Sequence, residues 1–514
     1  MTAWAVRAAL FLLIAAAGAL AKGIEHVLLI SVDGMHQVDL DKFVTAHPDS
    51  YMAKLVAKGV TYPNTHILPP SDSFPGLLSL VTGATAKTTG VYYDDAYSRI
   101  LSPRGDLACK QIGAEIIMDE SIEVDDTTLF SGISVDNLPR DPAKNCAPFF
   151  PHSYPKVNTI FEVLRAAGKT TAWCDKHWAY DLVNGPSGNG VVDLFTPEVI
   201  AVTPPDDFEL VFGNDMLKVQ AVLNQIGGRD SNNTKNQPVP TIMGLDFQTL
   251  SVAQKKWGYL DAAGTPTPQV LQALQDVDAA LGSFMARMKS AGIAGKSAII
   301  LSAKHGQSPI DRTTLNKIPS SKLSAAIAAV APNEPAQLTT DDVALIWLKD
   351  SSNAPKIAAA LQASNGLGVS KVLFGAALNA QFGGVADRIP DIIVIVTPGV
   401  IYTGAAKIME HGGFGEDDTH VPIVVYAPFV KGGVVVSDAV ATTQVAPTIL
   451  TLLDQDPNAL QGVVAEGTKV LPGIHFDLHG LGATLEDVLS FGAQAPVSAP
   501  ASAPSSAQAP VPKP

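Results

Sequence analysis

Three segments of the sequence place chemically capable side chains at or just after apolar runs. HVLLISVDG ends in Asp33-Gly34, IILSAKHGQ carries Lys304-His305, and PPSDSFPGLL carries Ser73 ahead of a Phe-Pro pair. Open α/β sheets bind ligands at the carboxyl ends of their strands, where we expect Asp33 and His305. Asp is a hard oxygen donor for a divalent cation, and a hydroxyl beside such an ion becomes a nucleophile.

Ser73 has two interpretations. Pro75 is favourable in a first helical turn, so a helix is predicted to begin near Phe74, and a Ser directly before it would serve as the N-cap. Ser71 and Asp72 compete for that capping role. In the other interpretation, the Ser73 hydroxyl faces the anion-binding N-terminus of the helix and attacks the substrate.

Further candidate site residues follow other strand-like runs. TTAWCDKHWAYD carries Lys176 as a candidate phosphate contact and His177 as a candidate replacement metal ligand, although an ordinary polar loop has the same composition. Asp95 in GVYYDDAY either lines the substrate entrance or caps a turn. Asp246 ends the run PTIMGLD, and His411 begins a glycine-rich loop.

These landmarks, taken in chain order, resemble a known family. The landmarks are a strand ending in Asp-Gly, the P-S-D-S-F-P segment before a helix ending in Val-Thr-Gly, the S-A-K-H-G segment and a late His-Gly segment. They are similar to the type I phosphodiesterase/nucleotide pyrophosphatase family of the alkaline phosphatase superfamily, whose metal motif Ser-x-His-Gly the S-A-K-H-G segment resembles. The resemblance implies a metal-dependent hydrolase of phosphate esters that forms a phosphoseryl intermediate on Ser73. It also implies one or two divalent ions, with zinc expected, held by Asp33, Ser73, Asp246, His305 and His411.

Three positions depart from the family pattern. Lys304 stands where the family has a metal-binding Asp, Leu250 where it has a His, and Gly76 where it has an Asn that helps to hold a transition-state oxygen. A protonated ammonium cannot ligate a cation, but it stabilises an anionic oxygen and lowers the pKa of a nearby hydroxyl. We therefore predict one metal ion plus a catalytic Lys304, or a weakened metal pair. The alternatives are a non-catalytic binding protein and a hydrolase of sulfate or phosphonate esters.

Apolar strand-like runs alternate with amphipathic helical runs along the body of the chain. This alternation predicts an α/β fold with a mostly parallel central sheet and helices on both faces. Residues 92–154 and 185–239 have weak periodicity, so we expect loop-rich insertions that form a cap beside the site. The predicted strands are 26–33, 170–175, 240–246, 298–305, 343–349, 391–397 and 422–428, and the predicted helices are 74–83, 155–168, 267–292 and 442–454.

The two ends of the chain are expected to lie outside the hydrolase domain, which would span residues 22–493. Residues 1–21 combine Arg7, a short apolar run and a small-x-small cleavage pattern, which is typical of a signal peptide; an uncleaved anchor is the alternative. Residues 494–514 are rich in Pro, Ala and Ser and are predicted to be disordered. The product would therefore be secreted or periplasmic.

The cysteines and the net charge limit the cellular environment and the ligands that we expect for this protein. In an exported protein Cys109 and Cys146 are the expected disulfide pair, and Cys174 is expected to be a small buried apolar residue. The net charge of −14 argues against binding to duplex nucleic acid. A small phosphate ester or nucleotide is the expected ligand, captured by local charges or metal. No integral membrane span is expected after signal cleavage.

Overall fold

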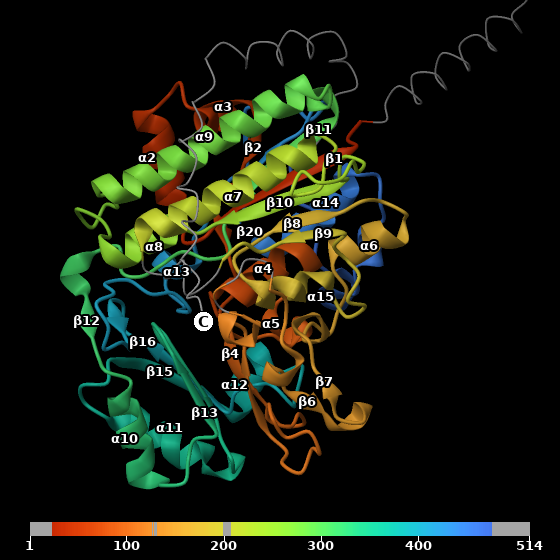
Figure 1. Cartoon of the computed structure of the whole chain (residues 1–514). Coiled ribbons are helices and arrows are strands. Elements are labelled where there is room, and N and C mark those ends of the chain that lie inside the picture. The colour runs from red at the N-terminus through yellow and green to blue at the C-terminus, as the bar shows by residue number, and fades with distance from the viewer. Residues whose placement is uncertain (1–22, 126, 128–130, 199–206, 475–514) are drawn as a thin grey trace, which may run out of the picture.

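The computed structural model describes residues 23–125, 127, 131–198 and 207–474, and is built around one large sheet (Figure 1). The sheet has eight strands in the order β19-β2-β18-β11-β1-β10-β8-β9. The strands β11, β1, β10, β8 and β9 run parallel to one another, whereas β18 is antiparallel to both β11 and β2. Their bounds are β1 (His26–Val32), β2 (Val60–Thr61), β8 (Ala172–Cys174), β9 (Asp193–Phe195), β10 (Ile242–Phe247), β11 (Ser297–Ser302), β18 (Val424–Tyr426) and β19 (Val434–Val435).

The central strand β1 is buried on both faces. Val27 and Leu29 point into one hydrophobic cluster, and Leu28 and Ile30 point into a second cluster on the opposite face. Side chains alternate along a strand, so a continuous apolar run serves a sheet that is covered on both sides. The predicted mostly parallel sheet with helices on both faces is confirmed.

Two groups of helices provide the cover. In Figure 1 the group above the sheet includes the two long helices α7 and α9, and the group below it includes α4, which carries Ser73. The upper group is α2 (Gln37–Ala46), α3 (Tyr51–Lys58), α7 (Phe208–Ile226), α8 (Thr249–Lys256) and α9 (Pro268–Ser290). The lower group is α4 (Ser73–Thr82), α5 (Ala86–Thr89), α6 (Ile160–Ala166), α14 (Val445–Leu452) and α15 (Gln461–Glu466).

A second, antiparallel sheet lies beside the first, at the lower left of Figure 1. Its strands are β13 (Gln337–Thr340), β14 (Val343–Trp347), β16 (Ile392–Val396) and β15 (Val369–Phe374), in that order. One face packs on α10 (Ser321–Val330) and α11 (Ala354–Ala363). The other face packs on α12 (Gly375–Phe382) and on Tyr92 and Tyr93, which connects it to the chain near the site.

This second sheet corrects part of the sequence prediction. The predicted strands 343–349 and 391–397 exist as β14 and β16, but they pair with each other and not with the central sheet. The predicted strand 422–428 joins the central sheet as the antiparallel β18. Apolar periodicity identifies a strand but carries no information about its partner, so these assignments needed the tertiary structure.

The two predicted insertions differ from each other. Residues 92–154 contain short hairpins, namely β4 (Asp95–Ser98) with β5 (Ala114–Ile117) and β6 (Arg140–Asp141) with β7 (Ala147–Pro148). Residues 185–239 are not loop-rich throughout, because they contribute β9 to the central sheet and the 19-residue helix α7. The buried polar residues Asp215 and Lys218 of α7 pair with each other, and they interrupt the apolar periodicity that would have revealed the helix.

Several other predictions concern the chain ends and the cysteines. The signal peptide 1–21 and the disordered tail 494–514 fall outside the described residues. Cys109 and Cys146 form the expected disulfide, and Cys174 is buried as a free cysteine. Among the residues that the structure describes, none of the helices has the length and apolarity that crossing a membrane demands.

Helix α7 holds the end of β10 in place through a buried ion pair. Lys218 Nζ lies 2.9 Å from Asp215 Oδ1 and donates to the carbonyl of Asp246 at 2.6 Å. Asp215 also accepts hydrogen bonds from the backbone N–H groups of Gln248 and Thr249, at the start of α8. This pair positions the end of β10, which contains Asp246, and the start of α8, which follows it.

Replacing Asp215 by Ala should destabilise the protein by about 3–5 kcal/mol, because the buried Lys218 ammonium and two backbone donors would lose their acceptor. Urea unfolding measures the change. The matched control is Gln220→Ala on the exposed face of the same helix, which should change the free energy of unfolding by less than about 0.5 kcal/mol. Equal effects of the two substitutions would contradict the assigned role of Asp215.

Candidate functional site

The helix α4 begins at Ser73, and its N-cap is Asp72. The Asp72 carboxylate accepts a hydrogen bond from the backbone N–H of Phe74 at 3.0 Å. The capping interpretation of Ser73 is therefore wrong, since its neighbour fills that role. The Ser73 hydroxyl instead lies 3.2 Å from Nε2 of His305, at the positive end of the helix dipole.

His305 and Asp33 lie side by side at the carboxyl ends of β11 and β1. His305 Nε2 is 2.8 Å from Asp33 Oδ1. His305 Nδ1 donates to the Gly306 carbonyl at 2.8 Å, so in the neutral ring Nε2 carries the lone pair. Burial lowers the pKa of His305 although Asp33 opposes the shift. Two acceptor atoms thus face each other, and Asp33 Oδ1 has no hydrogen-bond donor among the described residues.

The second oxygen of Asp33 is paired with Lys176. Lys176 Nζ lies 2.5 Å from Asp33 Oδ2, and both side chains are largely buried. Burial alone would raise the pKa of Asp33, but the Lys176 ammonium holds it well below its ordinary value. The structure therefore brings the predicted residues Asp33, Ser73, Lys176 and His305 together around one carboxylate.

Lys304 occupies a separate, fully buried ion-pair cluster. Its ammonium lies 2.9 Å from Asp246 Oδ2 and 3.4 Å from Asp175 Oδ1, and it donates to the Tyr180 hydroxyl at 3.1 Å. Burial opposes the charge, but Asp175 and Asp246 raise the pKa of Lys304 above its ordinary value. Asp175 is fixed in turn by the Trp173 indole N–H at 2.8 Å. Asp175 follows the strand β8 directly, and Tyr180 lies in the 3-10 helix Trp178–Asn184. Sequence reasoning assigned neither of them a catalytic or metal-binding role.

The side chains available as ligands show which of the two metal positions implied by the family resemblance this chain could fill. The cluster of Asp33 Oδ1, Ser73 Oγ and His305 Nε2 offers mutually facing oxygen and nitrogen donors, which fits one divalent cation. The second implied position does not fit. Leu250, at the usual His position, is buried in the hydrophobic core, and the Asp246 carboxylate already faces the Lys304 ammonium.

His411 lies beside His305, with the two ring centroids 4.1 Å apart. Its Nδ1 is 3.7 Å from Asp72 Oδ1, beyond hydrogen-bonding distance, and neither atom has a hydrogen-bond partner within the described part of the chain. The Ser71 hydroxyl accepts from the Gly412 N–H and donates to the Gly413 carbonyl. These bonds join the nucleophile loop, residues 67–72 ahead of Ser73, to the His411 loop, residues 411–415. His411 therefore belongs to the same site as Ser73.

His177 and Asp95 have surroundings other than those predicted. His177 lies with Glu120 and Glu198, and their ligand atoms lie within 4.8 Å of one another. Burial and then Lys176 lower the pKa of His177 to about 3, so its ring is neutral. Asp95 binds Gln337 at 2.7 Å on β13, where burial raises its pKa to about 8. Asp95 thus joins the hairpin β4–β5 to the second sheet.

Gly76 is the only residue type that its position admits. A Cβ atom there would lie 2.2 Å from the carbonyl oxygen of Lys304 and 2.8 Å from the Lys304 carbonyl carbon. The Asn of the family pattern therefore has no room, because the chain at Lys304 packs directly on helix α4. This close contact places His305 next to Ser73.

An α/β sheet with Ser73 at a helix N-terminus, and with Asp33 and His305 at its carboxyl edge, defines a member of the alkaline phosphatase superfamily. The type I phosphodiesterase / nucleotide pyrophosphatase family matches residues 27–418, and the chain belongs to this family. It is accordingly a hydrolase of phosphoric ester bonds. No curated relative matches the chain by sequence.

Solved structures with the same fold include murine ectonucleotide pyrophosphatase/phosphodiesterase 5. It aligns with a TM-score of 0.57 and 15% sequence identity, covering 84% of this chain and 96% of that chain. An inactive variant of the same murine protein in complex with AMP aligns with identical values. At this identity the likeness concerns the fold.

Replacing Gly76 by Ala should lower the free energy of unfolding by about 1–3 kcal/mol, because the new methyl group would push the Lys304 backbone away from α4. Hydrolytic activity should also fall, because the shifted backbone would move His305 away from Ser73. Urea unfolding and initial rates measure the two effects. Gly213→Ala is the control: Gly213 is helical with open space at its Cβ position, so that change should stabilise slightly.

Replacing Lys304 by Met should cost about 3–5 kcal/mol, since Asp175 and Asp246 would be left buried without their cation. Adding Asp246→Asn to Lys304→Met should recover part of that loss. Chemical denaturation of the single and double variants gives the coupling energy. Purely additive effects of the two substitutions would show that the Lys304–Asp246 pair does not interact.

Proposed function

We propose that this chain is an exported, metal-dependent phosphodiesterase or nucleotide pyrophosphatase that acts through a phosphoseryl intermediate on Ser73. The observation that carries the proposal is the position of the Ser73 hydroxyl, which is free of the capping role and lies 3.2 Å from His305 Nε2. One divalent cation, for which zinc suits the nitrogen and oxygen donors, would be held by Asp33, Ser73 and His305. It would supply positive charge to the reacting oxygens.

The proposed reaction has two balanced steps. The Ser73 oxygen attacks the phosphorus of the ester, the Oγ–P bond forms, and the leaving alcohol departs with a proton. Water then attacks the phosphoseryl group, which frees Ser73 and releases a phosphate monoester. The N-terminus of α4 stabilises the negative charge of the phosphoryl oxygens throughout.

The two lysines are proposed to have different tasks. Lys176 contacts one oxygen of Asp33, and His305, which lies beside Ser73, contacts the other. The Lys176 charge therefore lies close to the position at which an anionic substrate would bind. Lys304 is fully buried among Asp175, Asp246 and Tyr180, and we assign it a positioning role in place of the catalytic role expected from the sequence. In this interpretation the Lys304 charge substitutes for the second ion of the family pattern.

Nucleotides are the proposed substrate class. Family membership and the AMP complex of the murine neighbour support it. Export to the periplasm or medium is supported by the signal pattern of residues 1–21 and by the Cys109–Cys146 disulfide, because disulfides persist in oxidising compartments. Sulfate esters, phosphonate esters and a purely binding role are the outcomes that the next experiment separates.

Replacing Ser73 by Ala should lower kcat for bis-p-nitrophenyl phosphate by about 1000-fold or more, because the covalent step loses its nucleophile. Mass spectrometry of quenched parent enzyme should locate the phosphoryl adduct on Ser73. Ser79→Ala, which removes a buried hydroxyl on the same helix, is the control and should keep most activity. A parent enzyme that turns over only sulfate or phosphonate esters, or no ester with Zn²⁺, Mn²⁺, Mg²⁺ or Ca²⁺, would contradict the proposal.

Metal analysis tests the number of ions at this site. After dialysis with zinc, the parent protein should retain one more ion per chain than the Asp33→Asn variant. A difference of two ions would contradict the single-ion site, and no difference would contradict metal binding by Asp33.

A further inference from the structure

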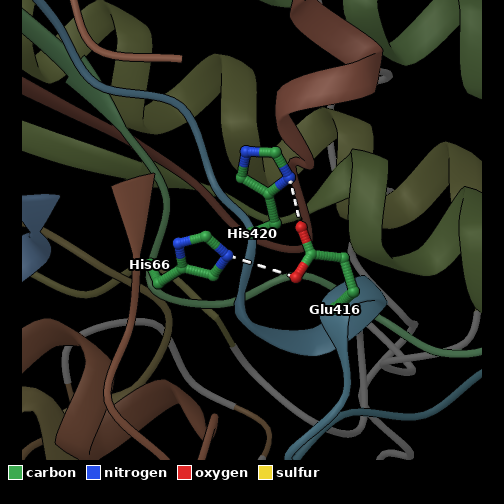
Figure 2. Close-up of side chains that lie close together, drawn as sticks. All are labelled: His66, Glu416 and His420. Atoms are coloured by element: carbon green, nitrogen blue, oxygen red, sulfur yellow. Dashed lines mark hydrogen bonds and ion pairs between the residues drawn. The ribbon is translucent and has the colours of Figure 1, made fainter. Parts of the chain in front are cut away.

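A further group of side chains that could hold a metal lies at the surface and consists of His66, Glu416 and His420. Figure 2 shows both imidazole rings directed at the one carboxylate. His66 Nε2 lies 3.2 Å from Glu416 Oε2, and His420 Nδ1 lies 2.9 Å from Glu416 Oε1. The backbone forms an antiparallel bridge between His66 and His420, which stacks the rings with centroids 4.8 Å apart.

The outer hydrogen bond of His420 decides which atom faces the cluster. His420 Nε2 donates to the carbonyl of Pro63 at 2.7 Å. In the neutral ring, Nδ1 therefore carries the lone pair and points at the Glu416 carboxylate, so two acceptors face each other across 2.9 Å. Either a proton on Nδ1 or a cation between the two atoms makes this contact favourable, and a bound cation would satisfy both acceptors at once. A backbone carbonyl on the far ring nitrogen is also the usual support of a metal-binding histidine.

The spacing suits zinc. Tetrahedral Zn²⁺ with bonds of about 2.0–2.2 Å separates its ligand atoms by roughly 3.3–3.6 Å. The three ligand atoms already lie within 4.8 Å of one another, so small side-chain adjustments would complete the geometry. Two imidazoles and one carboxylate suit zinc far better than calcium or magnesium, which take oxygen ligands. A cavity of about 190 Å³ beside Glu416 and His420 leaves room for water as a further ligand.

The cluster joins two loops that carry active-site residues. His66 ends β3 (Thr65–His66), shortly before the Ser71–Ser73 segment, and Glu416 begins α13 (Glu416–Thr419), shortly after His411. The carbonyl groups of this short helix and of His420 also accept N–H bonds from other parts of the site. These bonds are Ile67 N–H to Thr419, Gly306 N–H to Asp418 and Gln37 N–H to His420.

We propose that His66, Glu416 and His420 bind one zinc ion that clamps the nucleophile loop to the His411 loop. The clamp is separate from the Asp33–Ser73–His305 cluster and performs no chemistry on the substrate. Both loops lack regular strand pairing along most of their length, so a coordinated ion replaces the support that a sheet would give. Loss of the ion should loosen Ser73 and His411 together.

Zinc titration of the chelator-stripped protein, read by competition with a chromophoric chelator, tests the site. The parent should bind one more ion per chain than His66→Ala, His420→Ala or Glu416→Gln, and each variant should weaken that binding at least about tenfold. Zinc should also raise the Tm of the parent by more than that of these variants, which keep only the contribution of the proposed Asp33–Ser73–His305 site. The three side chains are partly exposed, so the variants should fold.

Two controls separate this site from the proposed function. His152→Ala removes a similarly exposed histidine, paired with Asp181 away from the cluster, and should behave like the parent. Ser73→Ala should retain the zinc-dependent rise in Tm even when hydrolysis is lost, so the two proposals fail independently. The clamp is overturned if His66→Ala and His152→Ala bind the same amount of zinc, or if zinc shifts the Tm of His66→Ala as much as that of the parent.

Discussion

Buried carboxylates at the carboxyl edge of the central sheet must each meet a cation, and the arrangement of the site follows from this requirement. Lys176 pairs with Asp33, and Lys304 pairs with Asp175 and Asp246. A charge removed from water without a partner is very costly, so these ion pairs are fixed features of the folded state. They also decide where a divalent ion fits. The Lys304 ammonium beside Asp246 repels such an ion, whereas Oδ1 of Asp33 has no hydrogen-bond donor among the described residues and can ligate it.

The same edge of the sheet determines how the nucleophile is presented. Asp72 caps α4, which releases the Ser73 hydroxyl, and Gly76 lets α4 approach the chain at Lys304. These two local features bring Ser73 and His305 within 3.2 Å. A larger residue at position 76, including the Asn of the family pattern, would separate them.

Ser73 begins helix α4 directly after a loop, and His411 lies within a loop; these two loops are supported in two ways. Ser71 binds Gly412 and Gly413 directly, and α13 accepts hydrogen bonds from the segments on either side. The proposed zinc ion at His66, Glu416 and His420 would add a third link between the same loops. Rigid support of this kind holds a catalytic group within the narrow range of geometry that chemistry requires.

The sequence by itself determined the local features: apolar runs that form strands, Ser73 before Phe-Pro, and Asp33 and His305 at strand ends. These depend on residues close together in the chain, which periodicity and capping rules describe. Only the tertiary structure decided the partners. It paired 343–347 with 392–396 in a second sheet, placed α7 against β10, set Lys176 on Asp33, and brought His66 to His420. Such contacts join distant segments, and their energy comes from burial and charge pairing that no single segment contains.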